Sequence, residues 1–248
     1  MFLEEARRRL PEPLDREQLH RLADEAAHLE DARYLTFEDA FRGSREEIKK
    51  RVAVYLPVLR EGSGPDRRPI LDVGCGRGEL LEVLREHGLP ASGIDSNRAA
   101  VEQCQVRGLD AAASDAFDAL AKVPDGTLGA LTAIHVVEHL PMDLLFRLLD
   151  EALRVLRPGG VAIFETPNPQ NVLVGSSTFY IDPTHRNPVH PQTLHYLVEA
   201  RGMIRVETLL LHPYPVEKRV PDGDSLLART FNDYFYGPQD YAVIGRRP

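Results

Sequence analysis

The sequence contains little cysteine, no long apolar run and no basic stripe. Its two cysteines, Cys75 and Cys104, cannot form a disulfide framework and lack the spacing of zinc ligands, which is typical of proteins in a reducing compartment. No run reaches the roughly 18 apolar residues of a membrane-spanning helix. The first five residues, MFLEE, bring in charge at once, unlike a signal peptide. We therefore expect a soluble protein of the cytoplasm.

Positive charge is also in short supply, because the formal net charge is −8 over 248 residues. Binding to a nucleic acid needs a basic surface that neutralises phosphates, so we expect no nucleic-acid partner. The hydrophobic content of 43% is enough for one large domain with additions.

The chain is organised around ILDVGCGRG, residues 70–78. An apolar segment containing Asp72 leads into glycines at every second position, and such a turn brings bare N–H groups close to a ligand. The next apolar segment ends in Asp95, where a nucleotide-binding βαβ unit places a carboxylate for the ribose hydroxyls. The loop has no Walker lysine and reads G-x-G-x-G rather than G-x-G-x-x-G, so taken alone it leaves nicotinamide binding open.

From residue 69 onward, apolar strand patterns alternate with amphipathic helix patterns. We expect strands over 69–73, 91–95, 111–113, 128–134, 161–164, 204–211 and 241–245, and helices over 79–87, 98–107, 142–156 and 192–200. This order predicts an α/β fold, a mostly parallel sheet with helices on both faces. Ligands of such sheets bind beyond the carboxyl ends of the strands.

The flanks divide the chain further. We expect residues 1–66 to form a helical N-terminal cap that is solvated or makes an oligomer contact, with a capping box at Ser44 and Glu47 and a flexible linker over 61–66. Residues 67–248 would form the main domain, interrupted by irregular inserts at 166–190 and 213–236.

Four motifs carry a resemblance: LDVGCGRG (71–78), Asp95, VVEHL (136–140) and LRPGG (156–160). Together they resemble the class I S-adenosylmethionine-dependent methyltransferases. The resemblance implies a Rossmann-like, seven-stranded, mostly parallel sheet with a reversed last strand. It also implies S-adenosylmethionine as the cofactor and S-adenosylhomocysteine as the product.

The same resemblance assigns cofactor contacts by position. Gly74 and Gly76 would pack against the methionine part of the cofactor, and Asp72 would orient the loop and the amino group. Asp95 would accept hydrogen bonds from both ribose hydroxyls. Ser114, Asp115 and Ala116 would border the adenine, and His135 would face the sulfonium. Asp115 is equally suited to cap the helix that begins at Ala116.

A narrower resemblance rests on FRGS (41–44), ETPNP (165–169), FYIDPTH (179–185) and YGPQDY (236–241). These segments resemble the methyltransferase domain of bacterial O-antigen chain-terminating methyltransferase/kinases and related polysaccharide enzymes. The resemblance implies a glycan or phosphoglycan acceptor and a contact of Arg42 with the cofactor's carboxylate. We also expect peripheral association with membrane-bound glycan-assembly proteins, homo-oligomers through the N-terminal helices, and no kinase domain, because the chain stops at Pro248.

The acceptor decides which side chains carry the chemistry. A hydroxyl acceptor calls for a general base, for which His135, His139 and His185 are candidates. A phosphate acceptor is already ionised and needs cations and donors, for which His185 and Arg186 are the choice, with Tyr180 and Asp182 nearby. His139 could instead hold only its own loop in place. The spacing of Asp182, His185, His190 and His195 matches no standard ligand pattern, so we expect no metal.

The sequence thus predicts O-methylation of a cell-surface carbohydrate or phosphoglycan. One alternative is a small-molecule O-methyltransferase that acts on a quinone or lipid precursor. Another is a catalytically silent cofactor-binding module that recruits a glycan-assembly partner through residues 1–66.

Overall fold

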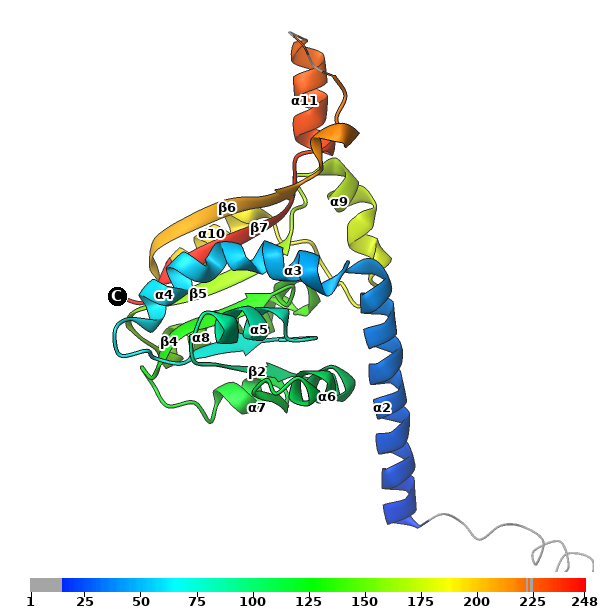
Figure 1. The fold of residues 1–248 in the computed structure, drawn as a ribbon, viewed down its shortest axis with the longest axis vertical. Helices are drawn as coiled ribbons and strands as arrows, with labels where there is room; N and C mark the ends of the chain where they lie inside the picture. Colours follow the sequence, from blue (N-terminus) through cyan, green and yellow to red (C-terminus); the bar gives the residue numbers. More distant parts are fainter. Residues whose placement is uncertain (1–14, 222, 224) are drawn as a thin grey trace, which may run out of the picture.

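The computed structural model describes residues 15–221, 223 and 225–248. Seven strands form one sheet in the order β3-β2-β1-β4-β5-β7-β6 (Figure 1). They are β1 Ile70–Val73, β2 Ala91–Asp95, β3 Ala111–Ala113, β4 Leu128–Ile134, β5 Leu156–Pro167, β6 Ile204–Pro213 and β7 Pro238–Arg246. The first five are parallel, and β7 runs antiparallel to both of its neighbours. The predicted mostly parallel sheet with a reversed last strand is confirmed.

Helices cover both faces because alternate strand residues point to opposite sides. On one face, Leu71 and Val73 pack with α7 Ala116–Leu120, α8 Met142–Val155 and α10 Pro191–Ala200. Helix α8 buries leucines at 145, 148 and 149, a helical stripe, and each such side chain contributes about 1.5–3 kcal/mol. On the other face, Ile70 packs with α3 Arg45–Val52, α4 Leu56–Ser63 and α5 Glu79–Glu86. Helix α6 Arg98–Val106 lies beside β2 and β3.

The N-terminal region begins with α2 Arg16–Phe41, which runs past the carboxyl ends of the parallel strands (Figure 1). Of its described residues, Leu35 alone is buried. The α2 backbone is tied to α6, since Asn97 donates its side-chain N–H to the carbonyl of Asp31 at 2.8 Å. The chain turns at Gly43, where φ is +98°, and the predicted capping box of Ser44 and Glu47 starts α3.

The predicted flexible linker over residues 61–66 is wrong in its first half. Helix α4 continues to Ser63, and Gly62 is buried against the sheet. The packing is so close that a Cβ at Gly62 would lie 2.7 Å from the carbonyl oxygen of Gly129. Arg157 donates to the carbonyl of Gly62 at 2.8 Å and holds this contact. The α3–α4 segment therefore shares its core with β1, β4 and β5, and the division of the chain at residue 66 stays a prediction.

The two inserts are not the irregular loops that proline and weak periodicity predict. Residues 166–190 include α9 Val172–Ser176 and the 3₁₀ turn η3 Thr178–Ile181. Residues 213–236 include η4 Val216–Lys218 and α11 Leu226–Phe235, which projects from the top of the molecule in Figure 1. Both α9 and α11 begin with a side-chain cap, from Asn171 and Ser225, and such local signals start a helix without a long apolar stripe. Among the described residues, no helix is long and apolar enough to cross a membrane.

Candidate functional site

The glycine loop follows β1 directly and turns in a conformation that excludes other residues. Gly74 and Gly76 have φ of +71° and +48°, in the left-handed region. A Cβ at Gly74 would overlap the Cγ2 methyl of Val136, so that side of the loop has no room for a side chain. The tight turn is as predicted, but its N–H groups are not bare: Gly74, Gly76 and Gly78 donate to the carbonyl of Ile94, to Asp95 and to the carbonyl of Cys75.

Asp95, at the carboxyl end of β2, is joined to this loop. Its carboxylate accepts from the backbone N–H of Gly76 and of Asn97, each at 2.8 Å. One oxygen therefore fixes the glycine turn and the other fixes the start of α6. The carboxylate is half-buried and keeps lone pairs free for a ligand's hydroxyls.

Asp72 lies below the loop and is 4% exposed. It accepts a hydrogen bond from Thr132 Oγ1 at 2.7 Å. Burial raises the pKa of Asp72 to about 7, although the Thr132 bond and the nearby Arg42 guanidinium act in the opposite direction. Ionisation of this carboxylate therefore lowers the free energy of unfolding, and a cationic ligand group above the loop would offset part of that loss.

Arg42 reaches the loop from the end of α2. Its Nη1 lies 3.1 Å from the position that a Cβ on Gly76 would take, and 3.3 Å from Glu38 Oε1. Burial raises the pKa of Glu38, and the charge of Arg42 partly counters this. Arg42 therefore lies beside the glycine loop, and its contact with the cofactor's carboxylate stays a prediction.

The residues after β3 are arranged around a helix cap. Asp115 Oδ1 accepts from the N–H groups of Phe117 and Asp118 at 2.8 and 3.1 Å, and Ala116 is the first residue of α7. Ser114 donates to the carbonyl of Asp115 at 3.0 Å. The capping role of Asp115, which the sequence left open, is confirmed, and its second oxygen carries no bond within the described residues.

A cavity of about 370 Å³ opens at the carboxyl ends of β4 and β5, and we call it the edge cavity. Of the predicted acceptor residues, His135, His139, Asp182 and His185 line it. Tyr180 and Arg186 do not: both side chains are exposed, and Arg186 meets this region only through its backbone N–H, which donates to the carbonyl of Glu138 at 2.9 Å.

Other lining residues were missed by sequence reasoning. Helix α2 contributes Tyr34, Phe37 and Phe41, whose spacing of three and four places them on one helix face. That aromatic stripe could have been found in the sequence. Glu165 and Asp240 also line the cavity, from β5 and β7, and both lie inside motifs that carried the narrower resemblance.

His135 sits at the end of β4 with φ of +55°, a strained value for a residue with a side chain. Its Nδ1 is 3.1 Å from Glu138 Oε1, and its Nε2 is 3.7 Å from Glu165 and 4.0 Å from Asp240. Burial by itself lowers the pKa of His135, but the Glu138 bond and the surrounding carboxylates outweigh it and raise the pKa to about 9. At neutral pH this side chain is an imidazolium, which donates hydrogen bonds and does not accept a proton.

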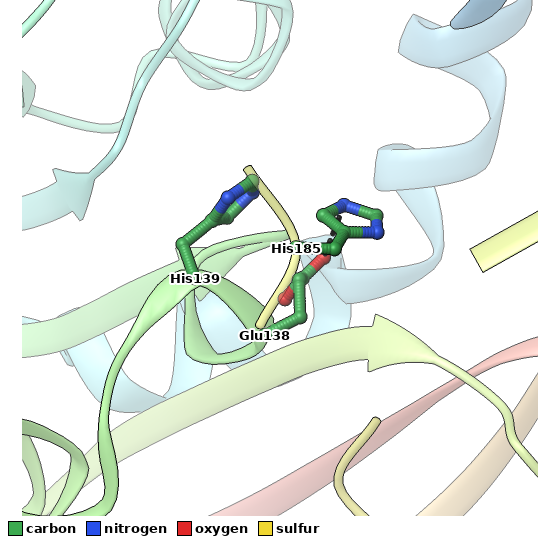
Figure 2. A group of neighbouring side chains, drawn as sticks. All are labelled: Glu138, His139 and His185. Carbon is green, nitrogen blue, oxygen red and sulfur yellow. Dashed lines mark ion pairs between the residues drawn. The ribbon is translucent and has the colours of Figure 1, made fainter. Parts of the chain in front are cut away.

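His139 and His185, which also line the cavity, lie beside Glu138 (Figure 2). The two imidazole centroids are 4.8 Å apart, and His185 Nε2 is 4.0 Å from Glu138 Oε1. Burial lowers the pKa of His139. His190 caps α10 and His195 Nδ1 is 2.9 Å from Thr208 Oγ1, so neither joins this group.

Carboxylates slightly outnumber cations around the edge cavity. Glu38, Asp182, Glu165 and Asp240 line it, with the cations Arg42, Arg51 and His135 among the described lining residues. Glu165 also accepts from the buried hydroxyl of Tyr55, and burial raises the pKa of Glu165. Such a lining favours neutral ligands with hydrogen-bond donors, or cations, over anions.

The sequence and the fold are similar to those of known proteins. A protein-family model described as a methyltransferase domain matches residues 41–207. A solved S-adenosylmethionine-dependent methyltransferase from Archaeoglobus fulgidus is 34% identical, with a TM-score of 0.79 over 86% of this chain and 99% of that one. A probable S-adenosylmethionine-dependent methyltransferase from Mycolicibacterium smegmatis is 28% identical over 178 residues, 71% of this chain and 67% of that protein.

A ubiquinone biosynthesis O-methyltransferase from Alkalilimnicola ehrlichii is 32% identical over 110 residues. That match covers 42% of this chain and 44% of the relative. The chain thus spans less than half the length of this relative, and the similarity concerns a part of each protein.

Proposed function

The chain belongs to the methyltransferase domain family of S-adenosylmethionine-dependent enzymes, and from this premise we propose that it methylates a hydroxyl oxygen of a carbohydrate. S-adenosylmethionine supplies an electrophilic methyl group when it is bound. Membership of an enzyme family speaks against the alternative of a catalytically silent module. The nicotinamide alternative is not supported either, since the matching family and relatives are methyltransferases.

The residues at the glycine loop fit this cofactor. The left-handed turn at Gly74 shapes the loop, the free lone pairs of Asp95 suit two ribose hydroxyls, and the buried charge of Asp72 suits an ammonium group. Arg42 offers a guanidinium for a carboxylate. We propose that these four residues hold the cofactor, with Ser114, Asp115 and Ala116 beside its adenine.

The observation that carries the acceptor proposal is the excess of carboxylates around the edge cavity. Carboxylates only accept hydrogen bonds, so they pair well with a molecule that presents several hydroxyl donors, as a sugar does. A phosphate would meet repulsion from Glu38 and Asp182, and Arg186, the cation expected to bind it, is exposed and does not line the cavity. Phe37, Phe41 and Phe179 add apolar surface for a sugar ring.

A quinone precursor is the second candidate. The similarity to ubiquinone O-methyltransferases favours it, and a cavity of about 370 Å³ with three phenylalanines would accept an aromatic ring. A phenol offers few donors, however, and would make fewer hydrogen bonds than a sugar to the remaining lone pairs of the lining carboxylates. Association with glycan-assembly proteins, homo-oligomers and a cytoplasmic location stay predictions.

The test is transfer of labelled methyl from S-adenosylmethionine into envelope material of a strain that lacks the gene. After the reaction, the label is measured separately in the polysaccharide and in the organic-soluble fraction. In a parallel assay, the polysaccharide acceptor is treated with phosphatase before the enzyme and S-adenosylmethionine are added. We expect label in polysaccharide regardless of phosphatase, and none with an Asp95→Ala enzyme.

Three outcomes would overturn the proposal. Label that disappears after phosphatase treatment would indicate a phosphate acceptor. Label confined to the organic fraction would establish the quinone or lipid candidate instead. No label in either fraction would reject both acceptor classes.

A further inference from the structure

Three potential ligand atoms gather at one wall of the edge cavity. A carboxylate oxygen of Glu138 and ring nitrogens of His139 and His185 all lie within 4.8 Å of one another. Figure 2 shows Glu138 and His139 extending from the turn η2 Val137–His139 and His185 approaching from a segment far along the chain. Ligands at the usual distance of about 2.0–2.2 Å from a tetrahedral cation are roughly 3.3 Å apart, so a contraction of about 1.5 Å would close the group around a cation.

The hydrogen bond of His185 determines which of its ring nitrogens has a lone pair for a cation. His185 Nδ1 lies 2.7 Å from the carbonyl oxygen of Phe179, which can only accept. Nδ1 therefore carries the hydrogen, and in the neutral ring the lone pair is on Nε2, the atom that faces Glu138 at 4.0 Å. A bond from the remote ring nitrogen to a backbone carbonyl is how proteins orient metal-binding histidines.

His139 is set up in the same way through a threonine. Thr184 Oγ1 donates its one hydrogen to Asp182 Oδ1 at 2.6 Å, so toward His139 it can only accept. The 2.9 Å contact between His139 Nδ1 and Thr184 Oγ1 then places the hydrogen on Nδ1 and leaves Nε2 with a lone pair. Tyr34 donates to Asp182 Oδ2 at 2.7 Å and fixes the outer end of this chain of bonds.

Glu138 completes the set as a carboxylate with no exposed side-chain surface. Its Oε2 accepts from Thr166 Oγ1 at 2.9 Å, which orients the group. Its Oε1 lies 4.0 Å from His185 Nε2 and also 3.1 Å from His135 Nδ1, so a cation would share this oxygen with His135. A second carboxylate–histidine group, His135 with Glu165 and Asp240, lacks this arrangement. The Nδ1 of His135 is 3.1 Å from Glu138 Oε1 rather than beside a backbone carbonyl, and its Nε2 is 3.7 Å from Glu165.

We propose that Glu138, His139 and His185 bind one divalent transition-metal cation of the zinc class, and that it holds the acceptor's hydroxyl oxygen in the edge cavity. Two imidazoles and a carboxylate select such a cation over magnesium or calcium, which prefer oxygen ligands. Three protein ligands leave positions open, and both histidines line the cavity, so the open positions face the space where an acceptor enters. The acceptor role rests on the proposed function, whereas binding of the cation does not.

The test measures metal binding by the full chain. The purified protein is stripped with a chelator, dialysed against Zn²⁺, and its zinc content is measured by mass spectrometry; Co²⁺ titration with visible absorption gives the affinity. His139→Phe and His185→Phe keep an aromatic ring and remove the nitrogens, and His195→Phe is the matched control outside the group. Thermal melting shows whether each variant is folded.

We expect one zinc per chain in the wild type and in His195→Phe, and roughly 10–100-fold weaker Co²⁺ binding in the other two variants. Equal metal content in all four folded proteins, or none in the wild type, would overturn the site. Methyl transfer that is unchanged in the stripped protein and in His185→Phe would overturn the acceptor role. Zinc binding with no methylation of carbohydrate would reject the proposed acceptor and leave the metal site standing.

Discussion

Replacing Asp72 with asparagine should stabilise the ligand-free protein, although it removes a residue at the cofactor loop. Asp72 is 4% exposed, and its pKa is about 7 in the folded protein against an ordinary value of 3.8. A carboxyl group with a raised folded-state pKa binds its proton more tightly in the folded than in the unfolded chain. Its ionisation therefore costs stability at every pH above the unfolded pKa, and the cost reaches its full value above the folded pKa.

The size of the effect follows from that difference in pKa. At about 1.36 kcal/mol per pH unit, ionised Asp72 lowers the free energy of unfolding by about 4 kcal/mol at pH 8. At pH 5 the folded-state carboxyl is protonated, and the cost falls to about 2 kcal/mol. Asp72→Asn keeps the shape and the acceptor for Thr132 but cannot ionise, so it should recover about these amounts.

Urea unfolding of the wild type and of Asp72→Asn at pH 8 and pH 5 tests this reasoning, with Asp110→Asn as an exposed control for loss of one negative charge. A gain of equal size at both pH values, or a loss at pH 8, would refute it. Calorimetry on the same proteins should show weaker S-adenosylmethionine binding by Asp72→Asn, because a cationic ligand group would lose its partner.

Two further predictions concern the same loop. Asp95→Ala should abolish cofactor binding, since it removes the ribose partner and the acceptor for Gly76 N–H; calorimetry that shows unchanged affinity would contradict the assignment. Gly74→Ala should lower the free energy of unfolding by about 2–3 kcal/mol, because φ is +71° and the new methyl group would overlap Val136. Adding Val136→Ala should recover part of this loss in urea unfolding, and no recovery would show that the backbone conformation alone sets the cost.

Much of the sheet could be predicted because local signals coincide with the strand ends. The strands over 91–95, 111–113 and 128–134 match the expected bounds, each following a turn and ending at a polar residue or directly before one. Strand β5 begins at Leu156, so the predicted start at Val161 is wrong. Its Pro-Gly-Gly run reads as a breaker, but the ladder continues on both sides of a bulge, with Leu156 opposite Leu128 and Val161 opposite Ala130.

The site was predictable only where it lies on strand ends. Asp72, Asp95 and His135 follow apolar segments directly, so the topology places them at one edge. The approach of His185 to Glu138 depends on the path of a segment that has no periodicity, and spacing carries no information about it. The wall made by α2 depends on where a largely exposed helix docks, which its own amphipathicity does not determine.

The strand order has a consequence for how such a protein can change over time. Apart from Arg42, the residues proposed to hold the cofactor lie on or just after β1, β2 and β3, on one side of β4, whereas Glu165 and Asp240 belong to β5 and β7 on the other side. Substitutions or insertions in the second half of the sheet can therefore alter the acceptor while the first half keeps its ligand. Exchange of the segments after β5 between relatives would therefore change the proposed acceptor side and keep the proposed cofactor side. The end of β5 is a suitable crossover point for engineered chimeras.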